Sequence, residues 1–259
     1  METKLNLQIT PIPCLTDNYA YIIHDNISKT VGVVDPSEAS PVINFLEKKN
    51  LKLNYILNTH HHFDHIGGNI ELKKKYGAKI IGFEGDKHRI PGIDIALKDN
   101  EKWTFGNSLI KILHIPGHTL GHICFFFEKE KIAFTGDTLF SLGCGRIFEG
   151  NHKQMLTSLN KIKKLPRDTK IYCGHEYTYK NAEFCIKYDK DNINLKKKFE
   201  IIKELRSKNL PTIPTGLEDE LNSNIFLRCD QKDLKIKLNM GNCEDYKVFK
   251  KVRDLKDSF

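Results

Sequence analysis

Short apolar runs alternate with polar breaks along the first two thirds of the chain. Runs rich in Val, Ile and Phe predict strands, and apolar residues every three or four positions predict helices. We expect strands at 7–13, 19–24, 30–35, 53–59, 79–83, 109–114, 122–127, 131–135 and 170–173, and helices at 40–50, 65–76 and 153–164. Because strands alternate with helices, the pattern predicts an α/β fold of packed layers.

The pattern changes after about residue 177, where the Val- and Ile-rich strand signal fades. Helical spacing continues at 179–188, 195–209 and 246–257, and Pro211 and Pro214 interrupt the chain between them. We therefore expect two domains, a layered catalytic domain over residues 1–177 and a mainly helical domain over residues 178–259.

Composition favours a folded chain, since 39% of the 259 residues are hydrophobic. No apolar run approaches the roughly 18 residues of a membrane span, and the start METKLNLQIT has no leader pattern. The seven cysteines include no Cys-x-x-Cys pair, which favours reduced thiols and a cytoplasmic location.

The net charge of +8 is compatible with nucleic-acid binding. However, the lysines are dispersed and no compact stripe of arginine and aromatic residues accompanies them, so we interpret them as a solvated surface. A few of these cations could still hold an anionic substrate near a site.

Four potential metal ligands fall within six residues directly after the apolar strand Tyr-Ile-Leu: His60, His62, Asp64 and His65. Imidazole and carboxylate together suit zinc, iron or manganese. His60 and His62 are two residues apart at a strand end, so their side chains can converge on one point.

Three more candidates, His118, Asp137 and His175, each follow a short apolar strand and a glycine. Ligand sites gather at the carboxyl ends of strands in layered folds. Seven ligands exceed the four of one tetrahedral zinc, which predicts two metals that share a bridging carboxylate and hold a hydroxide. His61 is expected to orient its neighbours, and His122 to pack behind the ligands. The other four histidines are expected to lie outside the site: His24, His88, His114 and His152.

The run Thr59-His60-His61-His62-Phe63-Asp64-His65 resembles the His-x-His-x-Asp-His signature of the metallo-β-lactamase superfamily. Further segments are similar to the glyoxalase II family, the hydroxyacylglutathione hydrolases: Gly117-His118-Thr119-Leu120-Gly121-His122, Thr135-Gly136-Asp137-Thr138-Leu139-Phe140, Gly143-Cys144-Gly145-Arg146 and Cys173-Gly174-His175-Glu176-Tyr177-Thr178. The resemblance covers nearly the whole chain. It implies an αβ/βα sandwich with a C-terminal, mainly helical domain that helps to hold glutathione.

The resemblance also implies roles for single residues. One metal would take His60, His62 and His118, the other would take Asp64, His65 and His175, and Asp137 would bridge them. Glutathione contacts would come from Arg146, Tyr177, Asn181, Arg253 and Lys256. Arg146 replaces a lysine that is common in the family, and Phe148 replaces a tyrosine of some relatives, so both exchanges bear on substrate affinity.

The implied reaction is hydrolysis of S-D-lactoylglutathione to D-lactate and glutathione, a step of methylglyoxal detoxification. A metal-bridging hydroxide would attack the thioester carbonyl, with Asp137 as the bridge and Asp64 as a ligand that can also handle protons. The expected cofactors are two divalent ions, zinc first and iron or manganese next. We expect a monomer with a small-molecule substrate and no nucleic-acid or membrane partner. The alternatives are a glutathione persulfide dioxygenase with one iron and an RNA-processing metallonuclease of the same superfamily.

Overall fold

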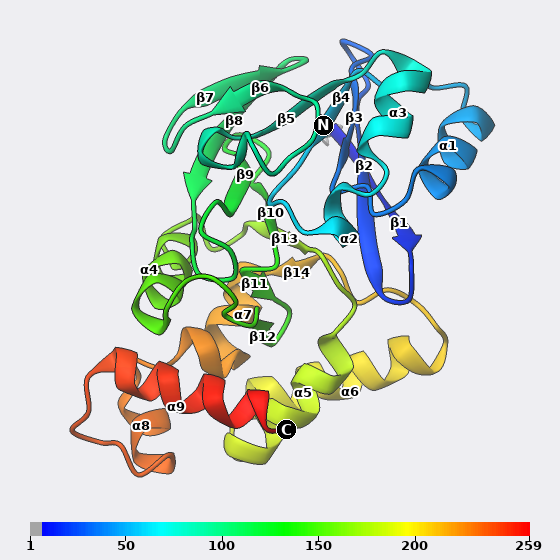
Figure 1. The fold of residues 1–259 in the computed structure, drawn as a ribbon. Coiled ribbons are helices and arrows are strands. Elements are labelled where there is room, and N and C mark those ends of the chain that lie inside the picture. Colours follow the sequence, from blue (N-terminus) through cyan, green and yellow to red (C-terminus); the bar gives the residue numbers. More distant parts are fainter. Residues whose placement is uncertain (1–6) are drawn as a thin grey trace. The chain divides into compact units, whose positions relative to one another are not determined.

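The computed structural model describes residues 7–259 (Figure 1). The chain divides into two compact units, and each unit combines separate stretches of sequence. The first unit runs to His114 and also takes in Gly121–Gly136, whereas the second consists of Ile115–Leu120 and Asp137–Phe259. In the described part of the chain, no helix has both the length and the apolar composition to cross a membrane.

The first unit contains a six-stranded sheet whose strands follow one another in chain order. The strands are β1 (Leu7–Cys14), β2 (Asn18–Asp25), β3 (Val31–Val34), β4 (Tyr55–Leu57), β5 (Lys79–Phe83) and β6 (Ile93–Leu97). β1 to β3 pair antiparallel, and β3 to β6 pair parallel. Because the carboxyl ends of parallel strands meet at one edge, the residues that follow β3 and β4 are brought together there.

Four antiparallel strands of the same unit face this sheet: β7 (Lys102–Phe105), β8 (Ser108–His114), β9 (Ile123–Phe127) and β10 (Ile132–Gly136). Aromatic rings fill the space between them, with ring centroids 5.6 Å apart for Tyr21 and Phe134 and 6.0 Å apart for Tyr55 and Phe105. Such aromatic contacts add to the stabilisation that burial alone provides.

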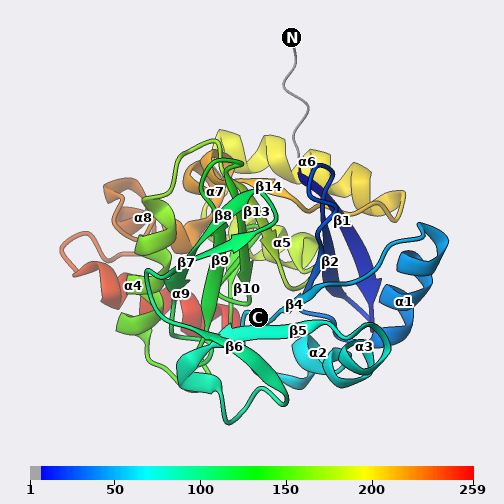
Figure 2. The same cartoon turned by 90° about the horizontal axis from the view of Figure 1, so that it is seen from above.

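Three helices, α1 (Ala39–Lys48), α2 (Phe63–Ile66) and α3 (Asn69–Tyr76), lie beside the first sheet in both views (Figures 1 and 2). Val42 and Leu46 of α1 and Leu72 of α3 are fully buried against strand residues such as Val33 and Ile80. Burial of one large aliphatic side chain contributes about 1.5–3 kcal/mol. The apolar face of each helix therefore fixes the outer layer of this unit.

The prediction of one helix over residues 65–76 is wrong, because the structure has two helices separated by Gly67 and Gly68. The amide of Gly68 donates to the Pro36 carbonyl instead of continuing the helical ladder. The carbonyl of Asp64, which would have accepted that bond, accepts instead from the Asn18 side chain at 3.0 Å. Tertiary hydrogen bonds thus replace one backbone hydrogen bond of the helix, and α2 ends at Ile66.

The second unit contains short strand pairs and most of the helices. β11 (Leu139–Phe140) and β12 (Gly143–Cys144) form a hairpin, and β13 (Lys170–Cys173) pairs antiparallel with β14 (Thr215–Gly216). The helices are α4 (His152–Lys163), α5 (Thr178–Tyr188), α6 (Ile193–Ser207), α7 (Leu217–Ser223), α8 (Lys232–Lys237) and α9 (Asp245–Asp257). Phe184, Phe226 and Phe249 form their aromatic core, with centroids 5.9 and 6.2 Å apart. The prediction of a helical region after residue 177 is confirmed.

Candidate metal centre

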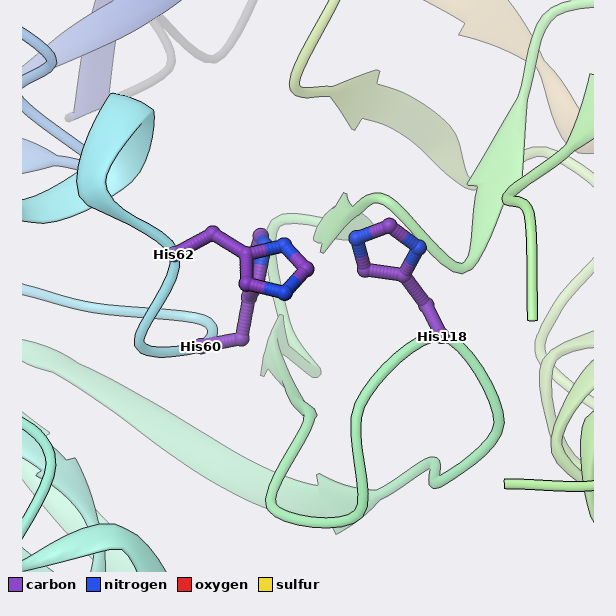
Figure 3. A group of neighbouring side chains, drawn as sticks. All are labelled: His60, His62 and His118. Carbon is purple, nitrogen blue, oxygen red and sulfur yellow. The ribbon is translucent and has the colours of Figure 1, made fainter. Parts of the chain in front are cut away.

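Four of the predicted ligands lie together in the first unit, on residues 58–66, which run from the end of β4 through α2. We call these residues the histidine segment. His60 and His65 are buried, whereas the Asp64 side chain is 39% exposed. The ring centroids of His60 lie 4.7 Å from His62 and 4.1 Å from His65. Figure 3 shows the His60 and His62 rings next to one another on this segment. Ligand atoms of His60 and His62 lie within 4.8 Å of each other, as do those of Asp64 and His65.

Asp35, which follows β3, holds two of these histidines in place. Its Oδ1 accepts from the Thr59 amide at 2.8 Å, and its Oδ2 accepts from the Thr59 hydroxyl at 2.6 Å. The same Oδ2 lies 3.1 Å from His65 Nδ1, and the Thr59 hydroxyl lies 3.1 Å from His60 Nδ1. With Nδ1 engaged in both rings, a metal would be bound through Nε2, and the partner on Nδ1 fixes the tautomer.

Sequence reasoning did not single out Asp35 or Asn18 as site residues. Asn18 Nδ2 donates to the Asp64 carboxylate at 3.0 Å and so orients a predicted ligand. A signal for Asp35 was present, because it directly follows the buried Val-rich strand β3, the same position that drew attention to Asp137. Asn18 offered no such signal, since it belongs to β2, which is distant in sequence from Asp64.

His61 belongs to the histidine segment and contacts Asp86, whereas His122 packs against His60. His61 Nδ1 lies 3.2 Å from Oδ2 of Asp86, a buried residue of the 3₁₀ turn η1 (Glu84–Asp86). The His122 ring is fully buried and stacks on the His60 ring, with centroids 4.6 Å apart and planes 17° apart. These contacts agree with an orienting position for His61 and a packing position for His122.

The three remaining predicted ligands lie together in the second unit, and all three are nearly buried. Oδ2 of Asp137 faces Nε2 of His175 at 3.2 Å and Nε2 of His118 at 3.6 Å. His118 Nδ1 lies 2.7 Å from the Arg146 carbonyl, a partner that fixes the ring with Nε2 toward Asp137. One carboxylate oxygen of Asp137 is thus directed at two imidazole nitrogens.

Gly145 allows the chain to pass close to the backbone of Asp137. A Cβ on Gly145 would lie 1.9 Å from the Asp137 carbonyl oxygen and 3.2 Å from His118 Nδ1. Because the nearest atom belongs to the backbone, a side chain at this position would displace Asp137 or His118.

Tyr177 and Asn181, two of the predicted glutathione contacts, also lie in the second unit. The Tyr177 ring stacks on His175, with centroids 4.6 Å apart and planes 6° apart. Asn181 is buried and donates through Nδ2 to the Ser141 carbonyl at 3.1 Å. Tyr177 is therefore placed against a predicted ligand, whereas the Asn181 amide is engaged by the backbone.

The three predicted cationic contacts, Arg146, Arg253 and Lys256, differ in exposure. The Arg146 side chain is 58% exposed, and its Nε lies 3.4 Å from Asp257 Oδ1. Arg253 is buried and donates through Nη1 to the Cys144 carbonyl at 2.7 Å. Lys256 Nζ donates to the Lys180 carbonyl at 3.3 Å, and partial burial lowers the pKa of its ammonium group. Phe148 is 61% exposed, and its ring centroid lies 5.2 Å from that of His118 with the planes 68° apart.

The types of donor present fit divalent cations. They are imidazole and carboxylate groups whose outer atoms are held by Asp35, Thr59 and the Arg146 carbonyl. Ligands that are held in this way suit divalent cations. Together with the fold, these His and Asp groups support divalent metal binding.

The fold and the histidine–aspartate groups define a metallohydrolase of the metallo-β-lactamase superfamily, whose profile matches residues 16–175. The C-terminal profile of hydroxyacylglutathione hydrolase matches residues 176–259. The chain belongs to the hydroxyacylglutathione hydrolase family, as its relatives also show. This result confirms the predicted family and the α/β fold class.

Two relatives carry the name hydroxyacylglutathione hydrolase. The protein from Pelagibacter ubique is 57% identical over 98% of this chain and 100% of its own length. The protein from Methylococcus capsulatus is 44% identical over 98% of this chain and 99% of its own. Among solved structures, BLEG-1, a B3 metallo-β-lactamase, matches 85% of this chain and 99% of its own with a TM-score of 0.66. At 24% identity, that likeness concerns the fold alone.

Proposed function

We propose that the chain is a thioesterase that hydrolyses S-(2-hydroxyacyl)glutathione, with S-D-lactoylglutathione as substrate and glutathione and D-lactate as products. The observation that carries the proposal is the Asp137 carboxylate, whose Oδ2 faces the Nε2 atoms of His118 and His175. The match of residues 176–259 to the hydroxyacylglutathione hydrolase C-terminus supports glutathione as the thiol part of the substrate. The reaction belongs to methylglyoxal detoxification.

The proposed centre holds two divalent metals, zinc in the first place and iron or manganese as alternatives. His60, His62 and His118 would hold one metal, Asp64, His65 and His175 would hold the other, and Asp137 would bridge them. When bound, such metals bring the pKa of a water molecule near 7 and polarise the substrate carbonyl. The fixed Nδ1 partners of His60, His65 and His118 support this assignment.

Asp64 and Asp137 would have different roles in the reaction. Asp137 is nearly buried between two imidazoles, so it serves to place ligands. Asp64 is the more exposed carboxylate and is oriented by Asn18, so it can accept or return a proton near the reacting carbonyl. The leaving group is a thiolate whose conjugate acid has a pKa of about 8.5, so its departure needs no separate general acid.

Arg146, Tyr177, Asn181, Arg253 and Lys256 would form the glutathione site. Arg146 and Lys256 present cations to the carboxylates of glutathione, and Tyr177 lies beside His175 at the thioester end. Asn181 and Arg253 hold the backbone of residues 141–144 and would act mainly by shaping the site. In this proposal residues 1–177 form the catalytic domain and residues 178–259 form the glutathione-binding domain.

We further propose that the chain acts as a monomer in the cytoplasm, on a small molecule and without nucleic acid. All seven cysteines lie among the described residues and none of them forms a disulfide, which supports a reducing compartment.

The test compares hydrolysis of S-D-lactoylglutathione with hydrolysis of the lactoyl thioester of N-acetylcysteamine, with zinc, iron and manganese measured on the same sample. We expect about two metals per chain and a clear preference for the glutathione thioester in kcat/KM. Equal rates on both thioesters would refute the glutathione site, and a single iron with no thioesterase activity would refute the reaction.

Asp137→Ala is the sharpest variant, with Asp219→Asn as a matched control on an exposed carboxylate of the same unit. The Ala variant should lose bound metal and turnover together, because no other carboxylate lies between His118 and His175 in the proposed ligand set. If Asp137→Ala kept two metals and full turnover, the bridging role would be disproved.

A further inference from the structure

The hairpin of β11 and β12 is held by side chains from a distant part of the sequence. The five consecutive carbonyl oxygens of residues 140–144 all accept hydrogen bonds from side chains between residues 181 and 253. The donors are Asn224 to Phe140 and Gly143, Asn181 to Ser141, the Cys185 thiol to Leu142, and Arg253 to Cys144. Because all five carbonyls of this buried hairpin are engaged by side chains, its conformation is specified from outside the hairpin.

The turn itself has a conformation that its residues do not favour. Leu142 has φ of 57°, in the left-handed region where a side chain is unfavourable. Its amide donates to Glu220 Oε2 at 2.8 Å, and the Ser141 hydroxyl donates to Glu220 Oε1 at 3.1 Å. Glu220 therefore contacts both central residues of the turn and holds them in this conformation.

Glu220 is fully buried in α7 and receives donors on both carboxylate oxygens. Lys198 Nζ lies 2.5 Å from Oε1, and the Thr215 hydroxyl donates to the same oxygen at 2.7 Å. Asn224 Nδ2 donates to Oε2 at 3.0 Å. One cation and four further donors contact this buried carboxylate, and each donor is held in position by it in return.

The hairpin connects Asp137 to Arg146, the two ends of the proposed site in this unit. Phe140 contacts His175 and Tyr177 edge-on, with centroids 5.9 and 5.4 Å apart. Directly after the hairpin, the Arg146 carbonyl fixes His118. A shift of the turn would therefore move partners of two predicted metal ligands.

We propose that Glu220 is a positioning residue for the reaction: it holds the hairpin 139–144 and so places His118 and His175 around Asp137. This inference rests on the proposed function for its kinetic consequence. Its structural consequence, the local stability of the turn, can be measured without any activity.

The experiment compares Glu220→Gln with Asp219→Asn, a neighbouring exposed carboxylate on the same helix. Glutamine keeps the size of Glu220, but it removes the charge and directs an NH₂ group toward a donor. Hydrogen exchange of the Leu142 amide should be about tenfold faster or more in Glu220→Gln, while amides of β1–β5 keep their rates. Zinc affinity from chelator competition should fall about 10–100-fold, as for other supporting partners of metal ligands. Asp219→Asn should match the wild type in both measurements.

The proposal is overturned if Leu142 exchanges at the wild-type rate in Glu220→Gln, or if all amides accelerate equally, since the role would then be general stability. Should Glu220→Gln fail to fold, Ser141→Ala removes one contact to the same carboxylate. It should accelerate exchange at Leu142 by a smaller factor, and an unchanged rate would equally overturn the proposal. If the wild type lacks thioesterase activity, the proposed function fails, whereas the exchange result still decides the role of Glu220.

Discussion

Replacement of Asp35 by asparagine should weaken metal binding without changing any proposed ligand. Asp35 has φ of 48°, a conformation that asparagine tolerates well, so the backbone should keep its path. The carboxylate accepts from the Thr59 amide and hydroxyl and lies 3.1 Å from His65 Nδ1. An asparagine offers one oxygen and one NH₂ group, so at least one of these three donors would face another donor.

The size of the effect follows from the two roles of these bonds. Loss of one hydrogen bond to a charged group costs about 1.5–3 kcal/mol of folding stability. Loss of a partner that orients a ligating histidine lowers metal affinity about 10–100-fold, which is about 1.4–2.8 kcal/mol. Because the Thr59 hydroxyl also lies 3.1 Å from His60 Nδ1, both predicted metal positions should be weakened.

The assay is a zinc titration against a competing chelator, followed by urea unfolding of the metal-free protein. The control is Asp94→Asn, which removes an ion pair with Lys73 at 2.7 Å in the same unit, away from the histidine segment. Both variants should lose stability, and only Asp35→Asn should lose zinc affinity. Unchanged zinc affinity in Asp35→Asn would refute the argument that Asp35 orients His65.

Three further changes test the charges and the cysteines. Although burial raises the pKa of Asp25, the amides of Asn107 and Ile27 outweigh it and lower the pKa below 3.8. The stabilisation by the Asp25 carboxylate is therefore present above pH 3.8 and lost as the pH falls. Asp25→Asn should lower the free energy of unfolding, measured in urea, by about 2 kcal/mol at pH 7 and by almost nothing at low pH. A difference that does not depend on pH would contradict this. Burial raises the pKa of the Cys185 thiol from 9.0 to about 12, so thermal stability should fall as the pH rises through that interval. The fall should be less steep in Cys185→Ala, and an equal dependence of stability on pH in both proteins would contradict the assignment. Lys256→Met should raise KM for the glutathione thioester about tenfold with little change in kcat, as expected for a contact to the remote end of the substrate, and a fall in kcat alone would exclude that role.

The strand and helix pattern could be predicted over most of the chain because it depends on local apolar spacing. All nine expected strands are present, including β13 with the predicted bounds Lys170–Cys173. β6, β7, β11, β12 and β14 were not predicted, and the last three have only two residues each, too few for an apolar pattern. The helix expected at 65–76 is divided because the Asn18 side chain and the Pro36 carbonyl take up its backbone groups. No local pattern contains those two contacts.

The sequence by itself determined the kinds of candidate metal ligand, their order and their places at strand ends, because these depend on residue type and on neighbours along the chain. It did not determine which groups hold the ligands in position. Asp35 reaches Thr59 across 24 residues, and Glu220 reaches Leu142 across 78. Only the tertiary structure decided those contacts, since a buried hydrogen bond depends on where two distant backbones approach one another rather than on the spacing of residues along either segment.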